Sequence, residues 1–287
     1  MSSGDTRGPV DPFERPSSAR AYGWMLGGRD VYAVDREILF YVLNRFPECV
    51  DIARQNRQFL YRAVRYLVEE AGIRQFLDMG CGLPTDNNVH EVAQRFDSRA
   101  RVVYVDIDPI VLAHGRALLA DHGDTTIVTA DMRMPEDILA DPAVERLIDF
   151  NEPVAVLFLS VGHHLKDVDG VGKGARHALR YIIDTVAVPG SHLAFSQGAC
   201  DNARIGAAFA ANIDDSGIPW QSRTPAEIDA LFDGLEPVAP GLLDVVNWRP
   251  DPNQPELEPV PEPLLPYIGA AARRTNVYEY GGVLRKP

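Results

Sequence analysis

The stretch QFLDMGCGLPT at residues 75–85 constrains the fold of this chain most strongly. A short apolar run ends at an acid, Asp78, and the chain then turns through Gly80 and Gly82 into residues 87–96, which have helical composition. A strand, a glycine turn and a helix begin a nucleotide-type site at the carboxyl end of the first strand of an open α/β sheet. Glycine suits the turn because a missing Cβ lets the backbone approach a ligand closely.

Two further acids follow the next two strand patterns. The run at residues 101–106 ends at Asp106, where a carboxylate can accept both hydroxyls of a ribose. Asp131 lies just past the pattern at residues 125–130, where an acid can accept from an adenine amino group and Met132 can pack on the ring. Asp131 alone could equally be a cap. Because Asp131 is the third acid to follow one of three consecutive strand patterns, we favour contact with an adenosine-containing ligand.

The glycine turn distinguishes between adenosine cofactors. A dinucleotide fingerprint needs a third glycine, but that position holds Thr85. The Asp78 carboxylate would repel a pyrophosphate and suits the ammonium of a methionyl group. The pattern therefore favours S-adenosylmethionine, with S-adenosylhomocysteine as product, over NAD and an oxidoreductase. The residues expected to bind it are Asp78, Gly80, Gly82, Leu83, Pro84, Thr85, Asp106, Ile107, Asp131, Met132 and Ser160.

Composition narrows the class of partner. The chain has 287 residues, of which 46% are hydrophobic, which is enough for a sizeable core. Its 28 basic and 41 acidic residues give a net charge of −13, which argues against nucleic acid or an anionic membrane as partner. Three cysteines indicate a reducing compartment, and neither a signal sequence nor a membrane-spanning run is evident. We expect a cytoplasmic protein.

The chain divides into three segments. We expect a mobile arm at residues 1–16, an N-terminal helical cap or lid at 17–72, and a cofactor-binding domain at 73–287. The domain alternates strands and helices, which indicates a parallel sheet with helices on both faces. Its predicted strands are 74–78, 101–106, 125–130, 153–159 and 190–196, and the tail patterns at 241–248, 267–273 and 277–283 predict an antiparallel hairpin at one edge.

Several residues of the predicted cap are candidates for contact with a substrate. Tyr22 and Trp24 belong to an aromatic, glycine-rich segment that is either packed on the main domain or a lid over the ligand. Asn56 interrupts the apolar face of a helix predicted at residues 48–71. A buried amide needs partners, so Asn56 and its neighbour Arg57 either tie down nearby backbone or point at the ligand.

His163 and His164 are the candidate catalytic residues. They follow the strand at 153–159, which should end beside the methyl donor, and imidazole can take a proton from a hydroxyl or an amine near neutral pH. The alternative is a pair of loop histidines that cap backbone groups. Adjacent loop histidines are poor evidence for converging ligands, so we expect no metal. For Cys81 we expect a packing role.

The motifs together resemble one bacterial family. PSSARAY at 16–22, ARQNRQFL at 53–60, QFLDMGCGLPT at 75–85 and VVYVDIDPIVLAHG at 102–115 are similar to those of S-adenosylmethionine-dependent methyltransferases formerly known only as a domain of unknown function. The resemblance covers roughly residues 13–200. It implies a Rossmann-like class I methyltransferase sheet, mostly parallel and seven-stranded, with the methyl donor at 78–85 and Asp106. Cys81 stands where Thr or Ser is expected.

Two functions fit the sequence. The first is an S-adenosylmethionine-dependent methyltransferase acting on an oxygen or nitrogen of a small-molecule metabolite. The Asn/Asp-Pro-Pro-aromatic motif of amino-methylating nucleic-acid enzymes is absent after residues 153–159, which favours a small molecule. The alternative is a non-catalytic regulatory protein that binds S-adenosylmethionine or S-adenosylhomocysteine and acts through a partner.

Overall fold

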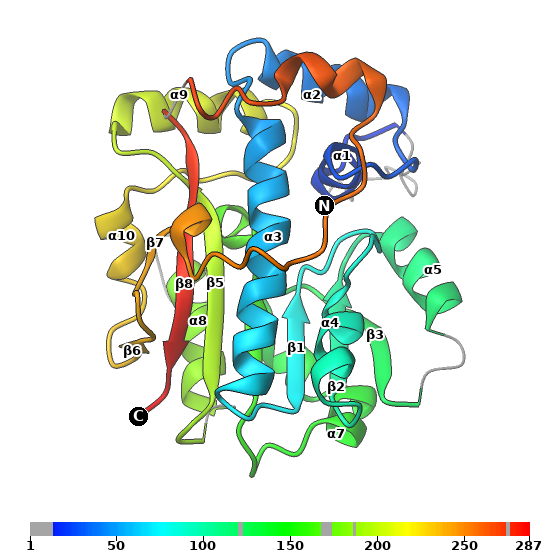
Figure 1. Ribbon diagram of the computed structural model, residues 1–287, viewed down its shortest axis with the longest axis vertical. Helices are drawn as coiled ribbons and strands as arrows, with labels where there is room; N and C mark the ends of the chain where they lie inside the picture. Colours follow the sequence, from blue (N-terminus) through cyan, green and yellow to red (C-terminus); the bar gives the residue numbers. More distant parts are fainter. Residues whose placement is uncertain (1–13, 120–122, 168–173, 186–187, 274–275) are drawn as a thin grey trace, which may run out of the picture.

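The computed structural model describes residues 14–119, 123–167, 174–185, 188–273 and 276–287 (Figure 1). Within these ranges one mixed sheet has the strand order β3-β2-β1-β4-β5-β8-β6, with β7 also paired to β8. Its parallel strands are β1 (Gln75–Met79), β2 (Arg101–Asp106), β3 (Thr125–Thr129), β4 (Ala155–Phe158) and β5 (His192–Ala199). The mostly parallel α/β fold predicted from the sequence is confirmed.

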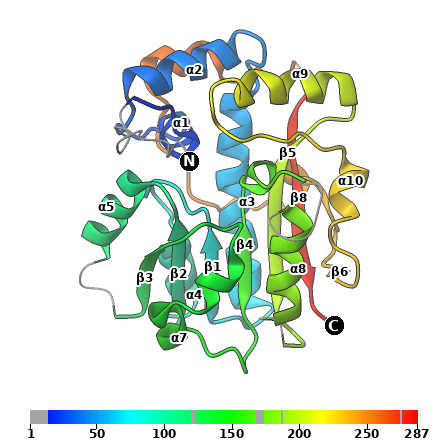
Figure 2. The ribbon, with the colours of Figure 1, turned by 180° about the vertical axis from the view of Figure 1, so that it is seen from behind.

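Helices cover both faces of the sheet (Figure 2). The strands are apolar on both faces; Phe76 belongs to one hydrophobic cluster and Leu77 to the other, as expected for buried parallel strands. One face is covered by α3 (Cys49–Glu69), α4 (Val89–Phe96) and α5 (Pro109–Leu118), and the other by α6 (Pro135–Leu139), α7 (Pro142–Leu147), α8 (Ala175–Thr185) and α10 (Pro225–Asp229).

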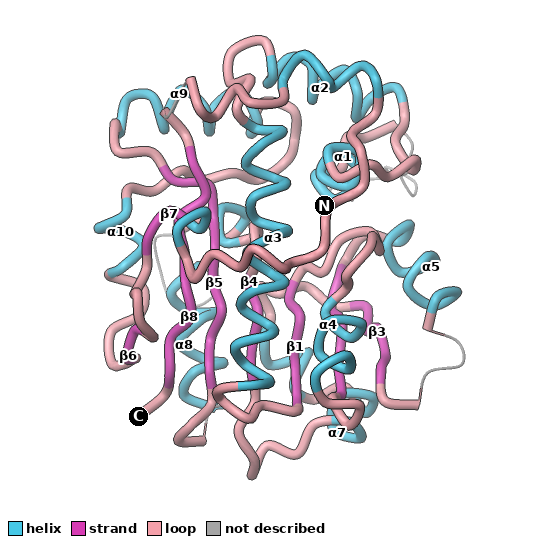
Figure 3. Tube along the Cα trace, viewed as in Figure 1, coloured by secondary structure: helices cyan, strands magenta, loops and turns pink. Residues whose placement is uncertain are grey.

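A third group of elements lies over the carboxyl ends of the parallel strands (Figure 3). It consists of α1 (Ser18–Met25), α2 (Ala33–Leu43), α9 (Ala203–Asp214) and the 3₁₀ helix η3 (Glu262–Tyr267). A buried ion pair at 2.7 Å between Arg20 and Asp35 joins α1 to α2. The long helix α3 begins in this group and continues down the sheet. Within the predicted cap at 17–72, α1 and α2 therefore lie over the strand ends, and α3 belongs to both layers.

The predicted antiparallel edge is confirmed, but residues 267–273 form no strand in it. β8 (Tyr278–Arg285) pairs antiparallel with β5 along its length, and the two-residue strands β6 (Glu236–Pro237) and β7 (Leu243–Asp244) pair with its other side. The sheet therefore has eight strands where seven were predicted. Residues 267–273, predicted as a strand, follow η3 as turns, because the prolines of η3 lack amide donors and Gly269 has a φ of +78°.

Other differences are local. Residues 135–147 form two helices because Asp141 and Pro142 end one and cap the next, with the Asp141 side chain accepting from the Ala143 amide. Residues 241–248 form β7 and the short 3₁₀ helix η2 (Val245–Asn247). Most of the arm predicted at residues 1–16 lies outside the described residues. In the described part of the chain, no helix is long and apolar enough to cross a membrane.

Candidate functional site

A cavity of about 660 Å³ lies at the carboxyl ends of β1 to β4, beneath α1. The strand ends and glycine turn contribute most of the predicted cofactor-binding residues to its wall, namely Asp78, Gly80, Gly82, Asp106, Ile107, Asp131, Met132 and Ser160. Leu83, Pro84 and Thr85 are not part of this wall. Leu83 packs against Gly23 of α1, Pro84 lines a small pocket behind Asp78, and the Thr85 amide donates to Asn88 at the cap of α4.

The glycine turn is held between β2 and β4. The amides of Gly80 and Cys81 both donate to the Val105 carbonyl, at 2.8 and 3.1 Å. Gly80 has a φ of +70°, and a Cβ there would come within 2.9 Å of Val161. Gly82 also has a positive φ, and its amide donates to Asp106 at 2.9 Å. The turn therefore needs glycine at both positions, and the backbone at Gly80 and Gly82 lines the cavity directly.

The two acids that precede and face the turn are buried. Burial raises the pKa of Asp78 to about 7; Arg57 opposes this shift and the nearby Asp106 adds to it. Burial also raises the pKa of Asp106, although the amides of Asp108, Gly82 and Ile107 donate to its carboxylate. Buried carboxyls in a cavity suit a ligand that brings a cation and hydroxyl donors. The ammonium and ribose of a methionyl nucleoside provide these groups, so the residues present fit that cofactor.

Asp131 and Met132 line the cavity at the end of β3, as expected for the adenine region. The carboxylate of Asp131 also accepts from Arg133, at 2.9 Å from Nε and 2.5 Å from Nη2. An adenine amino group would therefore share this carboxylate with Arg133. The Met132 sulfur lies 3.5 Å from the Cβ position of Gly80, so Met132 packs close to the turn.

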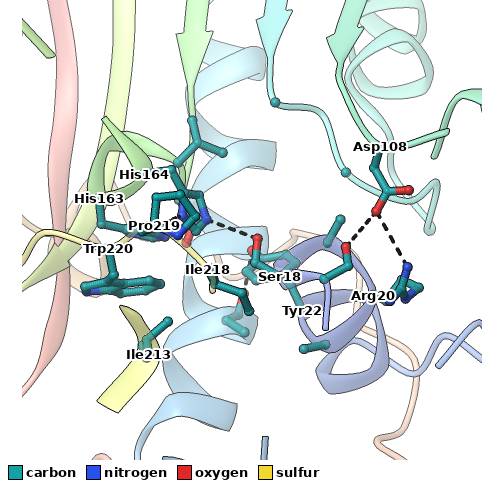
Figure 4. Close-up of a pocket in the computed structure, with 18 of the residues that line it drawn as sticks. Ser18, Arg20, Tyr22, Asp108, His163, His164, Ile213, Ile218, Pro219 and Trp220 are labelled. Carbon is teal, nitrogen blue, oxygen red and sulfur yellow. Dashed lines mark hydrogen bonds and ion pairs between the residues drawn. The ribbon is translucent and has the colours of Figure 1, made fainter. Parts of the chain in front are cut away.

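His164 presents a basic nitrogen at the cavity wall (Figure 4). Its Nδ1 lies 2.7 Å from the Pro219 carbonyl, which can only accept, so Nδ1 carries the proton. Nε2 is then the acceptor and receives the Ser18 hydroxyl at 3.0 Å. Burial lowers the pKa of His164, and the bond to Pro219 opposes this shift. A neutral imidazole with a fixed tautomer can act as a general base.

His163 supports this arrangement. Its ring stacks on Trp220 with centroids 3.6 Å apart, and its Nδ1 accepts from the Gly198 amide at 3.3 Å. Burial lowers the pKa of His163 well below its usual value, and His164 and Arg223 lower it further. In the neutral ring Nε2 therefore carries the proton. Of the two predicted catalytic histidines, His164 is the one with an accepting nitrogen at the cavity.

Asn56 joins the cap to the sheet. Its Oδ1 accepts from the Ser196 hydroxyl at 2.7 Å and its Nδ2 donates to the Tyr22 hydroxyl at 2.8 Å. Tyr22 in turn donates to the Ala53 carbonyl at 3.0 Å. Asn56 thus binds side chains rather than neighbouring backbone, and both Asn56 and Tyr22 line the cavity.

Arg57 and Trp24 take different places. Arg57 lines the cavity and donates to the Asp86 carbonyl and to Asn88, which holds the segment after the glycine turn. Trp24 is buried outside the cavity wall, where it packs edge-on against Phe40 of α2 at 5.7 Å.

The sequence did not indicate how α1 is fastened across the cavity (Figure 4). Ser18 reaches His164 on one side, and Ser17 donates to Asp108 at 2.7 Å on the other. Asp108 also caps α5, because its side chain accepts from the Ile110 amide. The two serines occur in the motif at residues 16–22, but only the fold identifies their partners.

The sequence also did not predict the second half of the cavity, which lies opposite the strand-end acids. It is formed largely by apolar side chains from α2, α3, α9 and the loop that follows α9, together with one acid from β8. These include Val42, Ile52, Phe209, Ile213, Ile218, Trp220 and Glu279. The acid inside an otherwise apolar strand pattern is the one local signal in the sequence. The rest of this half is assembled by tertiary packing.

A parallel sheet with an antiparallel last strand, and acids at the ends of its first three strands, defines the class I S-adenosylmethionine-dependent methyltransferases. The chain belongs to the S-adenosyl methyltransferase family, whose profile matches residues 6–287. S-adenosylmethionine is therefore its cofactor. No curated protein matches the chain.

Two solved structures are similar over nearly the whole chain. A DUF574 family protein from Streptomyces avermitilis MA-4680 is 36% identical, with a TM-score of 0.82 over 96% of this chain and 99% of that one. A protein from Thermobifida fusca YX, proposed to be a methyltransferase, is 40% identical, with a TM-score of 0.78 over 96% of each chain. A geranyl diphosphate methyltransferase complex, at 12% identity and a TM-score of 0.50 over 79% of this chain and 77% of that one, shares the fold.

Proposed function

We propose that the protein transfers the methyl group of S-adenosylmethionine to an oxygen or nitrogen of a small-molecule metabolite. The observation that carries this proposal is one continuous cavity that contains both the strand-end acids and the accepting nitrogen of His164. The net charge of −13 and the apolar walls of the second half favour a small, largely apolar acceptor over a nucleic acid.

Some residues of the cavity hold the methyl donor, and His164 activates the acceptor. When bound, the sulfonium would supply an activated methyl group open to in-line attack by a nucleophile, with the neutral sulfide as leaving group. Asp78 and Asp106 hold the donor, Met132 and Asp131 contact its base, and α1 excludes water from above. These roles follow from the positions of the residues at the strand ends.

His164 takes the proton that the acceptor must lose. The acceptor displaces the Ser18 hydroxyl from Nε2 and gives its proton to that nitrogen. The Pro219 carbonyl continues to accept from Nδ1 and stabilises the imidazolium that forms. Because burial lowers the pKa of His164, the base remains unprotonated to a lower pH than free imidazole does.

Turnover of a metabolite extract tests the proposal. The purified protein is mixed with S-adenosylmethionine and the extract, and formation of S-adenosylhomocysteine is measured together with the mass of any methylated product. We expect product with the native chain and loss of most of it with His164→Gln. Binding of the cofactor without any product would instead favour the non-catalytic regulatory protein.

A further inference from the structure

Glu279 is a buried acid in the cavity that has no part in the methyl-transfer scheme. It lies on β8, is 1% exposed and lines the cavity. Its partner across the sheet is Gly198 of β5. Residues directly opposite one another point to the same face of a sheet. A Cβ at Gly198 would lie 3.3 Å from the Trp220 ring, so Glu279 and Trp220 share that face, and the glycine leaves room between them.

Two polar atoms here have no hydrogen-bond partner among the described residues. They are Oε1 of Glu279 and Nε1 of Trp220. Burial raises the pKa of Glu279 to about 8; the adjacent Ser196 and Ser160 side chains oppose this shift, and Asp244 adds to it. A buried polar atom without a partner costs free energy of folding. Such a group at a cavity wall is therefore a candidate for ligand recognition.

The surroundings of Glu279 define what can bind there. The wall of this half of the cavity is apolar at Val42, Ile52, Phe209, Ile213, Ile218 and Val277, whereas Ser196 and Ser160 lie beside Glu279 itself. The charged side chain that acts on Glu279 is another carboxylate, Asp244. A buried carboxyl with an unpartnered oxygen, which a bound cation would ionise, favours a ligand with a positively charged or strongly donating head, and the apolar part of the wall favours an apolar body.

We propose that Glu279 is a specificity-determining residue that selects an amine on an apolar body as the methyl acceptor. This assignment rests on the proposed function and deepens it. The ammonium donates to Glu279 and gives one proton to His164 Nε2, which leaves a neutral amine. The nitrogen lone pair then forms the bond to the methyl carbon as the carbon–sulfur bond breaks, and that electron pair stays on sulfur. The product leaves as a methylated ammonium, and His164 releases its proton to solvent.

Matched amine and alcohol probes test this selection. The protein is saturated with S-adenosylhomocysteine, and calorimetry measures binding of phenethylamine, hexylamine and tryptamine against phenethyl alcohol, hexanol and tryptophol. We expect at least one amine to bind about tenfold or more tightly than its alcohol, as a charged hydrogen bond requires. Glu279→Gln should remove the preference without weakening S-adenosylhomocysteine. The exposed Glu236→Gln on β6 is the control.

The outcomes separate this assignment from the function on which it rests. Equal binding of amine and alcohol, a preference that survives Glu279→Gln, or no binding of any amine while S-adenosylhomocysteine binds would overturn the role of Glu279 and leave methyl transfer standing. Failure of S-adenosylhomocysteine to bind would overturn the proposed function itself, and the amine assignment with it.

Discussion

The two halves of the cavity are built in different ways. The cofactor half comes from the ends of consecutive parallel strands, and its residues fall within 78–160 of the chain. The acceptor half combines α1, α2, the start of α3, α9, the loop at Trp220 and the last strand, so its residues run from Ser18 to Glu279. A cofactor site at strand ends is thus encoded locally, whereas acceptor specificity depends on long-range packing.

The buried acids of the two halves also differ in their hydrogen bonding. Asp106 accepts from three backbone amides, which compensate its burial even before a ligand arrives. Glu279 has an oxygen with no partner among the described residues. The donors to Asp106 are thus part of the cofactor half itself, whereas the unpartnered oxygen of Glu279 is available to discriminate between acceptors.

Loss of the general base His164 should give the largest effect, and it should lower turnover without changing cofactor affinity. We expect His164→Gln to lower the rate of S-adenosylhomocysteine formation by about a hundredfold or more, which is typical of a general base. The affinity for S-adenosylhomocysteine should stay unchanged because the cofactor half is intact. His177→Gln on α8, a half-buried histidine outside the cavity, is the control. A comparable loss of cofactor affinity would show that the two halves are not separable.

Removal of Asp106, the acid at the end of β2, should lower the affinity of the cofactor half for its ligand. We expect Asp106→Asn to weaken S-adenosylhomocysteine by about a hundredfold in calorimetry, because it removes a charged acceptor from the ribose and from the Gly82 amide. Asp137→Asn, an exposed acid of α6, is the control. Unchanged affinity in Asp106→Asn would contradict the role of this strand end.

Cofactor affinity should depend on pH through Asp78. Its pKa of about 7 means that the free protein loses this proton as pH rises through neutrality. The ionised form binds the methionyl ammonium, so affinity should rise by about tenfold from pH 6 to pH 8. Arg57 and Asp106 are the charged groups that shift the pKa of Asp78, and both are retained in the control variant Asp78→Asn. Asp78→Asn should bind more weakly and lose the pH dependence, and a dependence that survives would assign it to another group.

The fastening of α1 should give the smallest effect. Ser18→Ala removes the hydroxyl that occupies His164 Nε2, and Ser17→Ala removes the contact with Asp108. Each hydrogen bond is worth about 1 kcal/mol, so we expect changes of about fivefold in KM for the cofactor or acceptor. Steady-state kinetics with the acceptor from the extract measures this. No change in either variant would show that α1 covers the cavity without these two bonds.

Most of the residues that the sequence indicated for the cofactor half line one cavity, because their signals are local. The apolar runs, the glycines and the acid after each strand occur within a few residues of one another, and the parallel sheet brings the strand ends together. Register then follows from the strands themselves, as in the pairing of Asp106 with Thr129. The strand predicted at 267–273 is absent because its apolar composition was outweighed by the prolines of η3 and by Gly269.

The acceptor half could not be predicted because its chemistry is set by distant partners. The choice of His164 as base depends on the Pro219 carbonyl and on Ser18 from α1. The space beside Glu279 depends on Gly198, which lies directly opposite it in β5. Neither relation has a fixed spacing along the chain, so no pattern in the sequence reveals it.

A crystal structure of the protein with S-adenosylhomocysteine tests the central claim most directly. We expect the ribose hydroxyls on Asp106, the adenine beside Met132, and the sulfur facing an open space bounded by His164, Trp220 and Glu279. A nucleoside bound elsewhere, or a sulfur directed away from His164, would contradict the division of one cavity into a cofactor half and an acceptor half.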